Sequence, residues 1–186
     1  GLGDVYKRQA IERLGEMELA VSNIVRSVSA LFSVIVNTLS GVTSSLVSNL
    51  IGAGEKRNVF PLCRRIIRLG YAAGVPLVVL ALLFHQSIIG AYTENPTIVQ
   101  AAWLPFAVML LNYFFALPGY VYLNAVTGTG ATRTVFIFQV TTTIAYLSCL
   151  WRLSHWNVPL AAYWAVEYLY VMLLGIQAII YLKYKQ

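Results

Sequence analysis

The chain has 186 residues, of which 59% are hydrophobic and only 11% are charged, and its mean hydropathy is +0.70. Soluble domains carry about 25% charged residues, so this composition excludes a disordered chain, a coiled coil and an ordinary soluble domain. The net charge of +6 does not indicate a nucleic-acid binder. Such a protein groups its basic residues on one polar face, whereas here they lie in the gaps between apolar runs.

Long stretches of the chain contain no charge. The uncharged intervals are 27–54, 69–93, 95–132 and 134–151, and Glu167 is the only charge in 153–182. A hydrocarbon core about 30 Å thick needs about 20 apolar residues per helix. These five intervals therefore predict an all-α polytopic membrane bundle with five spanning helices.

The predicted elements begin with a short polar connector at 10–20. The expected helices are 19–51, 60–85, 98–125, 134–151 and 159–183. Between the second and third lies a connector at 86–97 with the glycine, asparagine and proline typical of turns.

The first nine residues, GLGDVYKRQ, resemble the translation of a transposon-end adaptor used to prepare sequencing libraries. We therefore interpret residues 1–9 as foreign to the protein and exclude them from the fold. The alternative is a native tail outside the membrane. Because the chain also begins without methionine, we expect a native N-terminal part to precede residue 10.

Orientation follows from the excess of Lys and Arg in cytoplasmic segments of membrane proteins. Eight basic residues fall at one predicted end of the bundle: Lys56, Arg57, Arg64, Arg65, Arg68, Arg133, Lys183 and Lys185. We expect this end to be cytoplasmic, and the aromatic belt at the other end to include Tyr92, Trp103, Trp151 and Trp156.

Groupings typical of enzymes and metal sites are missing from the sequence. Cys63 and Cys149 are predicted at opposite ends of the bilayer, too far apart for a disulfide. His85 and His155 have no neighbouring ligand set, and the glycines of the 127–133 turn lack the pattern of a phosphate-binding loop. We predict that the protein is not an enzyme and needs no metal or cofactor.

The first predicted helix carries polar residues at steps of three and four, which keeps them on one face. They are Ser22, Arg26, Ser29, Ser33, Asn37, Ser40, Ser44 and Ser48. Such a face is costly against lipid. One interpretation is close helix packing, with the hydroxyls bonded to backbone carbonyls. The other is the wall of a substrate pathway that includes Ser33, Asn37 and Ser40. Asn37 then lies near mid-membrane, and Arg26 lies at the outer mouth.

Glu167 is the only acidic residue within a predicted span. A carboxylate at mid-bilayer costs about 2.5–3.5 kcal/mol on insertion scales, so it should face the bundle interior. Tyr163, Trp164 and Tyr170 share its helix face, and aromatic rings attract cations. This group predicts a site for a lipophilic cation, with exchange against a proton. The alternative is a structural acid bonded to a neighbouring helix.

Proline lies within the predicted spans at Pro76, Pro105 and Pro118. Proline removes a helical hydrogen bond and can bend the helix. Pro118 and Gly119 are the predicted hinge of the third helix, although such bends are also common in membrane helices that do not move.

Three segments resemble the multidrug and toxic compound extrusion (MATE) transporters. Residues 41–55, GVTSSLVSNLIGAGE, are similar to a small-residue helix that ends in a G-x-G-[DE] turn in that family. Residues 124–134, NAVTGTGATRT, are similar to its G-x-G-x-T-[RK] turn. Residues 164–170, WAVEYLY, are similar to the last helix of some bacterial members. Nearly all of 10–186 takes part in the resemblance.

The resemblance implies a protein of twelve helices in two lobes, of which residues 10–186 would be the C-terminal lobe without its first helix. It implies secondary-active export of amphipathic or cationic compounds across the bacterial inner membrane, driven by Na⁺ or H⁺. The implied partners are the lipid bilayer, those compounds and the N-terminal lobe, but no nucleic acid. Some members have an acidic residue on the helix that matches 98–125, where Asn112 is the nearest polar candidate here.

Other functions stay open at this stage. A flippase for lipid-linked oligosaccharides belongs to the same wider superfamily, but its cavity should be richer in Arg and Lys. A membrane-embedded enzyme should place His, Asp or Glu clusters at a membrane face. A receptor or structural scaffold would use the polar face only for packing.

Overall fold

The computed structural model describes residues 15–156 and 158–185, together with Val5, Lys7 and Ile11. Its elements are α2 (Glu16–Gly52), a 3₁₀ turn η1 (Lys56–Asn58), α3 (Val59–Leu83), α4 (His85–Gly90), α5 (Pro96–Gly128), α6 (Thr132–Ser154) and α7 (Leu160–Lys185). Five of these helical segments are long and apolar enough to cross a membrane. The predicted all-α polytopic bundle is therefore confirmed.

The ends of the five long helices lie within three residues of the predicted ends. The connector at 86–97 was predicted as turns, but in the structure its first part belongs to the short helix α4. Helix α5 then starts at Pro96, where the side chain of Asn95 accepts a hydrogen bond of 3.0 Å from the amide of Thr97. This cap satisfies one of the amides that a helix start leaves unpaired.

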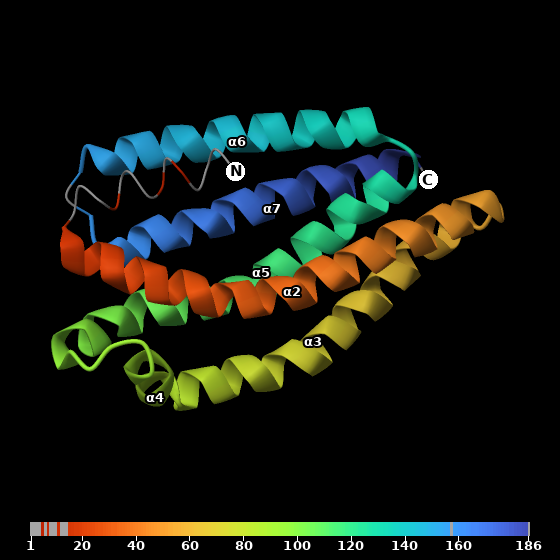
Figure 1. Cartoon of the computed structure of the whole chain (residues 1–186). Coiled ribbons are helices and arrows are strands. Elements are labelled where there is room, and N and C mark those ends of the chain that lie inside the picture. The colour runs from red at the N-terminus through yellow and green to blue at the C-terminus, as the bar shows by residue number, and fades with distance from the viewer. Residues whose placement is uncertain (1–4, 6, 8–10, 12–14, 157, 186) are drawn as a thin grey trace.

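The long helices run side by side, with α6 and α3 at opposite edges of the view in Figure 1. Helix α5 is the centre of the packing, because it contacts α2, α3, α6 and α7. Its buried side chains include Phe106, Leu110, Leu117 and Val121, each fully shielded from solvent. The position of α5 thus fixes the spacing of the four helices around it.

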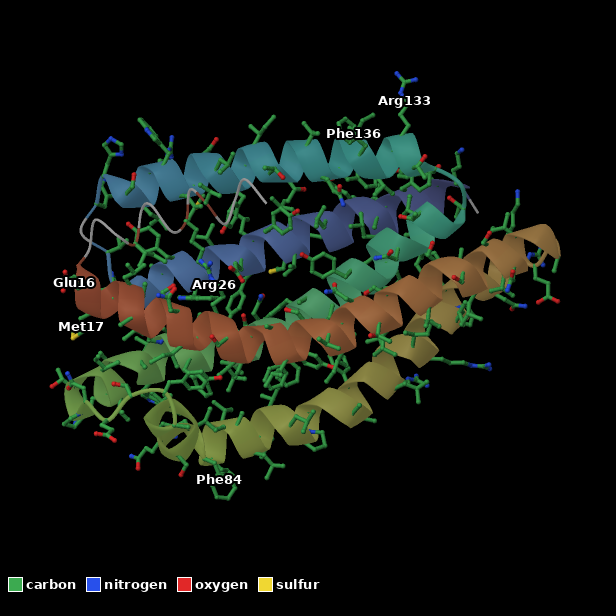
Figure 2. The ribbon with its side chains drawn as sticks, in the orientation of Figure 1. Glu16, Met17, Arg26, Phe84, Arg133 and Phe136 are labelled. Carbon is green, nitrogen blue, oxygen red and sulfur yellow. The ribbon has the colours of Figure 1, made fainter. Side chains whose placement is uncertain are left out.

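Large apolar side chains cover the outside of the bundle. Leu31, Leu69, Leu83 and Phe136 are each more than 60% exposed. Figure 2 shows Phe84, at the turn between α3 and α4, and Phe136, on α6, pointing away from the bundle. In water such a surface would drive aggregation, whereas in a bilayer it meets lipid chains of the same polarity.

Glycines let the central helix approach its neighbours closely. A Cβ added to Gly119 on α5 would lie 2.6 Å from the backbone oxygen of Val171 on α7. One added to Gly128 would lie 2.5 Å from the backbone oxygen of Ser44 on α2. Small residues at helix contacts are the usual means of tight packing in membranes.

Helix α5 continues without interruption through Pro118, which lies inside it. Gly119, the next residue, is buried at the contact with α7. Of the two predicted hinge residues, Gly119 therefore lies at a helix–helix contact. Their role as a hinge stays a prediction.

The close contact at Gly119 gives a test of this packing. Gly119→Ala should lower the free energy of unfolding by about 1–3 kcal/mol, since the new methyl group meets backbone that cannot rotate away. Gly41→Ala is the matched control, because a Cβ there meets nothing within 4 Å. The control should be neutral or stabilising by up to about 1 kcal/mol. Detergent-micelle unfolding followed by circular dichroism measures both, and equal effects would contradict the packing.

Candidate functional site

A cavity of about 830 Å³ lies between α2, α5, α6 and α7. Its polar and aromatic lining includes Arg26, Ser29, Phe32, Ser33 and Asn37 from α2, Asn112, Tyr113 and Tyr120 from α5, Thr143 and Tyr146 from α6, and Trp164, Glu167 and Tyr170 from α7, together with Lys7. The volume is in the range of cavities that hold drug-sized molecules. The cavity is the candidate functional site.

The structure brings six of the eight predicted pathway residues to this cavity. They are Ser33, Asn37, Asn112, Trp164, Glu167 and Tyr170. The other two are buried elsewhere in the bundle. Ser40 is 2% exposed and donates to the backbone oxygen of Val36, and Tyr163 is 1% exposed and donates to that of Leu153. Whether any of the eight contacts a substrate stays a prediction.

The packing interpretation describes part of the polar face of α2, and the substrate-pathway interpretation stays a prediction. The hydroxyls of Ser29, Ser33 and Ser40 each donate to a backbone oxygen three or four residues earlier, which satisfies them within the helix. Arg26, Ser29, Ser33 and Asn37 also line the cavity. The part of the face from Arg26 to Asn37 therefore forms a polar wall of the cavity, while Ser40 packs inside the bundle.

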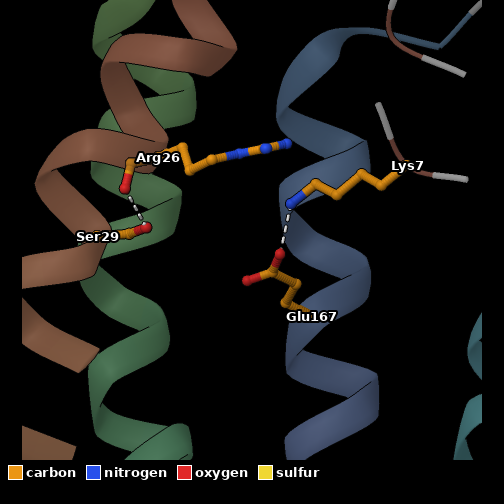
Figure 3. Close-up of polar contacts among 4 residues, drawn as sticks. All are labelled: Lys7, Arg26, Ser29 and Glu167. Atoms are coloured by element: carbon orange, nitrogen blue, oxygen red, sulfur yellow. Dashed lines mark hydrogen bonds and ion pairs between the residues drawn. The ribbon is translucent and has the colours of Figure 1, made fainter. Parts of the chain in front are cut away.

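Glu167 projects from α7 into the cavity, where its side chain is 30% exposed (Figure 3). The ammonium of Lys7 forms an ion pair with its carboxylate and lies 3.3 Å from the ring centroid of Trp164. Lys7 belongs to the segment that the sequence indicates is foreign. Its ammonium thus stands in for a tethered organic amine, held by a carboxylate and an indole face together.

Arg26 extends from α2 across the space toward α7, where Lys7 and Glu167 meet (Figure 3). Apart from Lys7, which lies in the segment interpreted as foreign, Arg26 and Glu167 are the two charged groups that line the cavity in the described part of the chain. One positive and one negative side chain leave its walls close to neutral. A cation can therefore bind at Glu167, and the weak net electrostatic field of the cavity does not exclude uncharged compounds.

Two buried polar atoms of the cavity walls have no hydrogen-bond partner in the described part of the chain. They are Oδ1 of Asn112 and Nε1 of Trp164. Buried polar groups are nearly always bonded, so these atoms are candidates for contacts with a bound molecule. One is an acceptor and the other a donor.

Four aromatic residues of the cavity were not predicted from the sequence, namely Phe32, Tyr113, Tyr120 and Tyr146, whereas Tyr170 was. Tyr146 on α6 and Tyr170 on α7 form an edge-to-face pair with ring centroids 5.6 Å apart. Tyr113 and Phe32 form another at 5.9 Å. Spacing could have indicated Thr143 and Tyr146, which are three residues apart on one face of α6.

The described residues contain no group of three or more His, Cys, Asp or Glu side chains that could hold a metal ion. Glu167 is the carboxylate that lines the cavity in that part of the chain. It can bind a proton, a monovalent cation or an organic ammonium, one at a time.

Binding of tetraphenylphosphonium tests this chemistry. Glu167→Gln should weaken binding by about tenfold or more, because the Coulomb attraction between the carboxylate and the phosphonium charge is lost. Lys7→Gln should strengthen it, because the competing ammonium is removed. Glu16→Gln, on an exposed acid outside the cavity, should change it less than about twofold. Equilibrium dialysis of the protein in micelles measures all three, and wild-type affinity in Glu167→Gln would contradict the assignment.

Comparison with known protein families gives one match. The family model described as MatE matches residues 10–151, which includes α2 to α5 and most of α6. Helix α7, with Glu167, lies beyond the matched range. No curated protein and no solved structure gives a significant match.

Proposed function

Since the chain belongs to the MatE family and is a multi-pass membrane protein of the MATE transporter type, we propose that it exports amphipathic cations by secondary-active transport. The family does not specify the compound or the driving ion. The proposal is therefore argued from the cavity and its charged groups.

One observation carries the proposal, namely the arrangement of Glu167 and Trp164 around an ammonium group. A carboxylate neutralises the charge of a cation, and an indole face accepts its apolar and cationic parts together. The tyrosines beside them, Tyr146 and Tyr170, extend this aromatic surface. Lipophilic cations are the class of compound that fits such a wall.

The export of an organic cation would be coupled to the entry of a proton or Na⁺ because both compete for the carboxylate of Glu167. A proton or Na⁺ that binds Glu167 excludes an organic cation from the same group, so the two would occupy the cavity in turn. Each ligand would stabilise the conformation that it binds more tightly. In secondary transporters, rocking of two halves around a central site then exposes that site to each face of the membrane in turn.

We also propose that the chain forms the C-terminal lobe of a two-lobed transporter. The similarity of 164–170 to the family's last helix supports this placement. Ser33 and Asn37 line the cavity yet are exposed, so the cavity opens between α2 and α7. An N-terminal lobe would cover this opening.

The flippase alternative needs several basic side chains against a pyrophosphate. Besides Lys7, Arg26 is the one basic residue that lines the cavity in the described part of the chain. Its charge is matched by that of Glu167. The balance of charge therefore favours a cationic substrate over a doubly anionic one.

Export itself can be tested with the complete gene in bacteria that lack their own drug exporters. The wild-type gene should protect growth against ethidium and lower its accumulation, whereas Glu167→Gln should lose most of this efflux because the cation site is neutralised. Glu16→Gln, at equal expression in the membrane, is the control. Glu167→Gln with wild-type efflux and wild-type dependence on Na⁺ and pH would remove Glu167 from the mechanism.

A further inference from the structure

A second cavity, of about 250 Å³, lies at the opposite end of the bundle from α4. It is formed where the end of α2, the η1 turn, the turn between α5 and α6 and the end of α7 meet. These segments are far apart in the sequence. The cavity is separate from the one that contains Glu167 and shares no lining residue with it.

Two lysines line this small cavity from different parts of the fold. Lys56 comes from η1 and Lys185 from the last turn of α7. The ammonium of Lys185 lies 5.6 Å from the ring centroid of Tyr181, one turn earlier, which favours its position beside the cavity. None of the lining residues in the described part of the chain is acidic.

The surroundings strengthen the positive potential of this cavity. Glu55 is the one described acidic residue at an end of the bundle that also carries Arg57, Arg133 and Lys183. Helix α6 begins beside the cavity without a side-chain cap, so the positive end of its dipole adds a smaller contribution. The chemistry therefore favours an anion.

The other walls indicate that this anion carries an apolar part. Val59 and Leu182 are almost completely buried at the cavity, and Ile51 lies beside them. The rim is formed by the ends of helices that are long and apolar enough to span a membrane, so we place it at the level of lipid headgroups. Basic pockets between such helices are known sites for anionic headgroups.

We propose that the cavity between Lys56 and Lys185 binds the phosphate group of an anionic phospholipid. The two ammonium groups contact the phosphate oxygens, and the apolar wall contacts the glycerol and the first part of the acyl chains. The lipid would join the ends of α2 and α7 to the turn between α5 and α6. This inference is independent of what the larger cavity transports.

Calorimetric titration of the protein in neutral micelles with dihexanoyl-phosphatidylglycerol tests this site. The wild type should bind this lipid about tenfold more tightly than dihexanoyl-phosphatidylcholine, which carries no net charge. The double variant Lys56→Gln/Lys185→Gln should lose about tenfold in affinity for phosphatidylglycerol. Helical content by circular dichroism should stay unchanged, because both side chains are exposed.

Arg65→Gln/Arg68→Gln is the matched control, because both arginines are exposed at the same end of the bundle, outside the cavity. This variant loses the same charge and should keep its affinity within about twofold. Equal loss of affinity in the two double variants would overturn the site, since only the overall positive charge at this end of the bundle would then attract the lipid.

A separate experiment adds inorganic phosphate at constant ionic strength. Phosphate that displaces the lipid at similar concentration would overturn the lipid assignment in favour of a free-anion site.

Discussion

Hydrocarbon cannot hydrogen-bond, and this constraint decides which side of each helix of this protein faces inward. On α2 it separates a face with Arg26, Ser29 and Asn37, which lines a cavity, from Leu31, which is exposed outside that cavity. Serine hydroxyls on the polar face bond to their own helix backbone. The longer side chains of Arg26 and Asn37 line the cavity. The polar interior is thus a consequence of the apolar surroundings. Glu167 lines the cavity in this interior, where charged molecules can reach it.

The central helix α5 makes this arrangement possible. Small residues at Gly119 and Gly128 let α7 and α2 approach it closely, so these two helices stand on either side of α5 with their polar faces toward one cavity. Tyr113 strengthens the other contact, with α3, by donating a hydrogen bond of 2.6 Å to the backbone oxygen of Gly70. Close packing of backbones and an open polar cavity are therefore two results of the same central helix.

The sequence predicts the helices well, because spans without charge determine them almost independently of tertiary structure. Glu167 and Asn37 could be predicted for a related reason, since a polar group within a span must face inward. The position of Ser40 could not be predicted in this way. It has the same spacing as the residues that line the cavity, but it lies where the helices pack together and no cavity separates them. Lys7 at Glu167 and the pair of Lys56 and Lys185 could not be predicted, because they depend on contacts between distant segments.

The central claim is that the polar face of α2 meets water while its apolar face meets lipid. Asn37→Cys and Leu31→Cys test it in lipid vesicles. Both variants carry Cys149→Ser, and they keep Cys63 because it is buried. A cationic thiol reagent reacts with the thiolate, which forms only in contact with water. The account predicts that Asn37→Cys reacts at least about tenfold faster than Leu31→Cys. Equal rates, or faster reaction at Leu31→Cys, would contradict it.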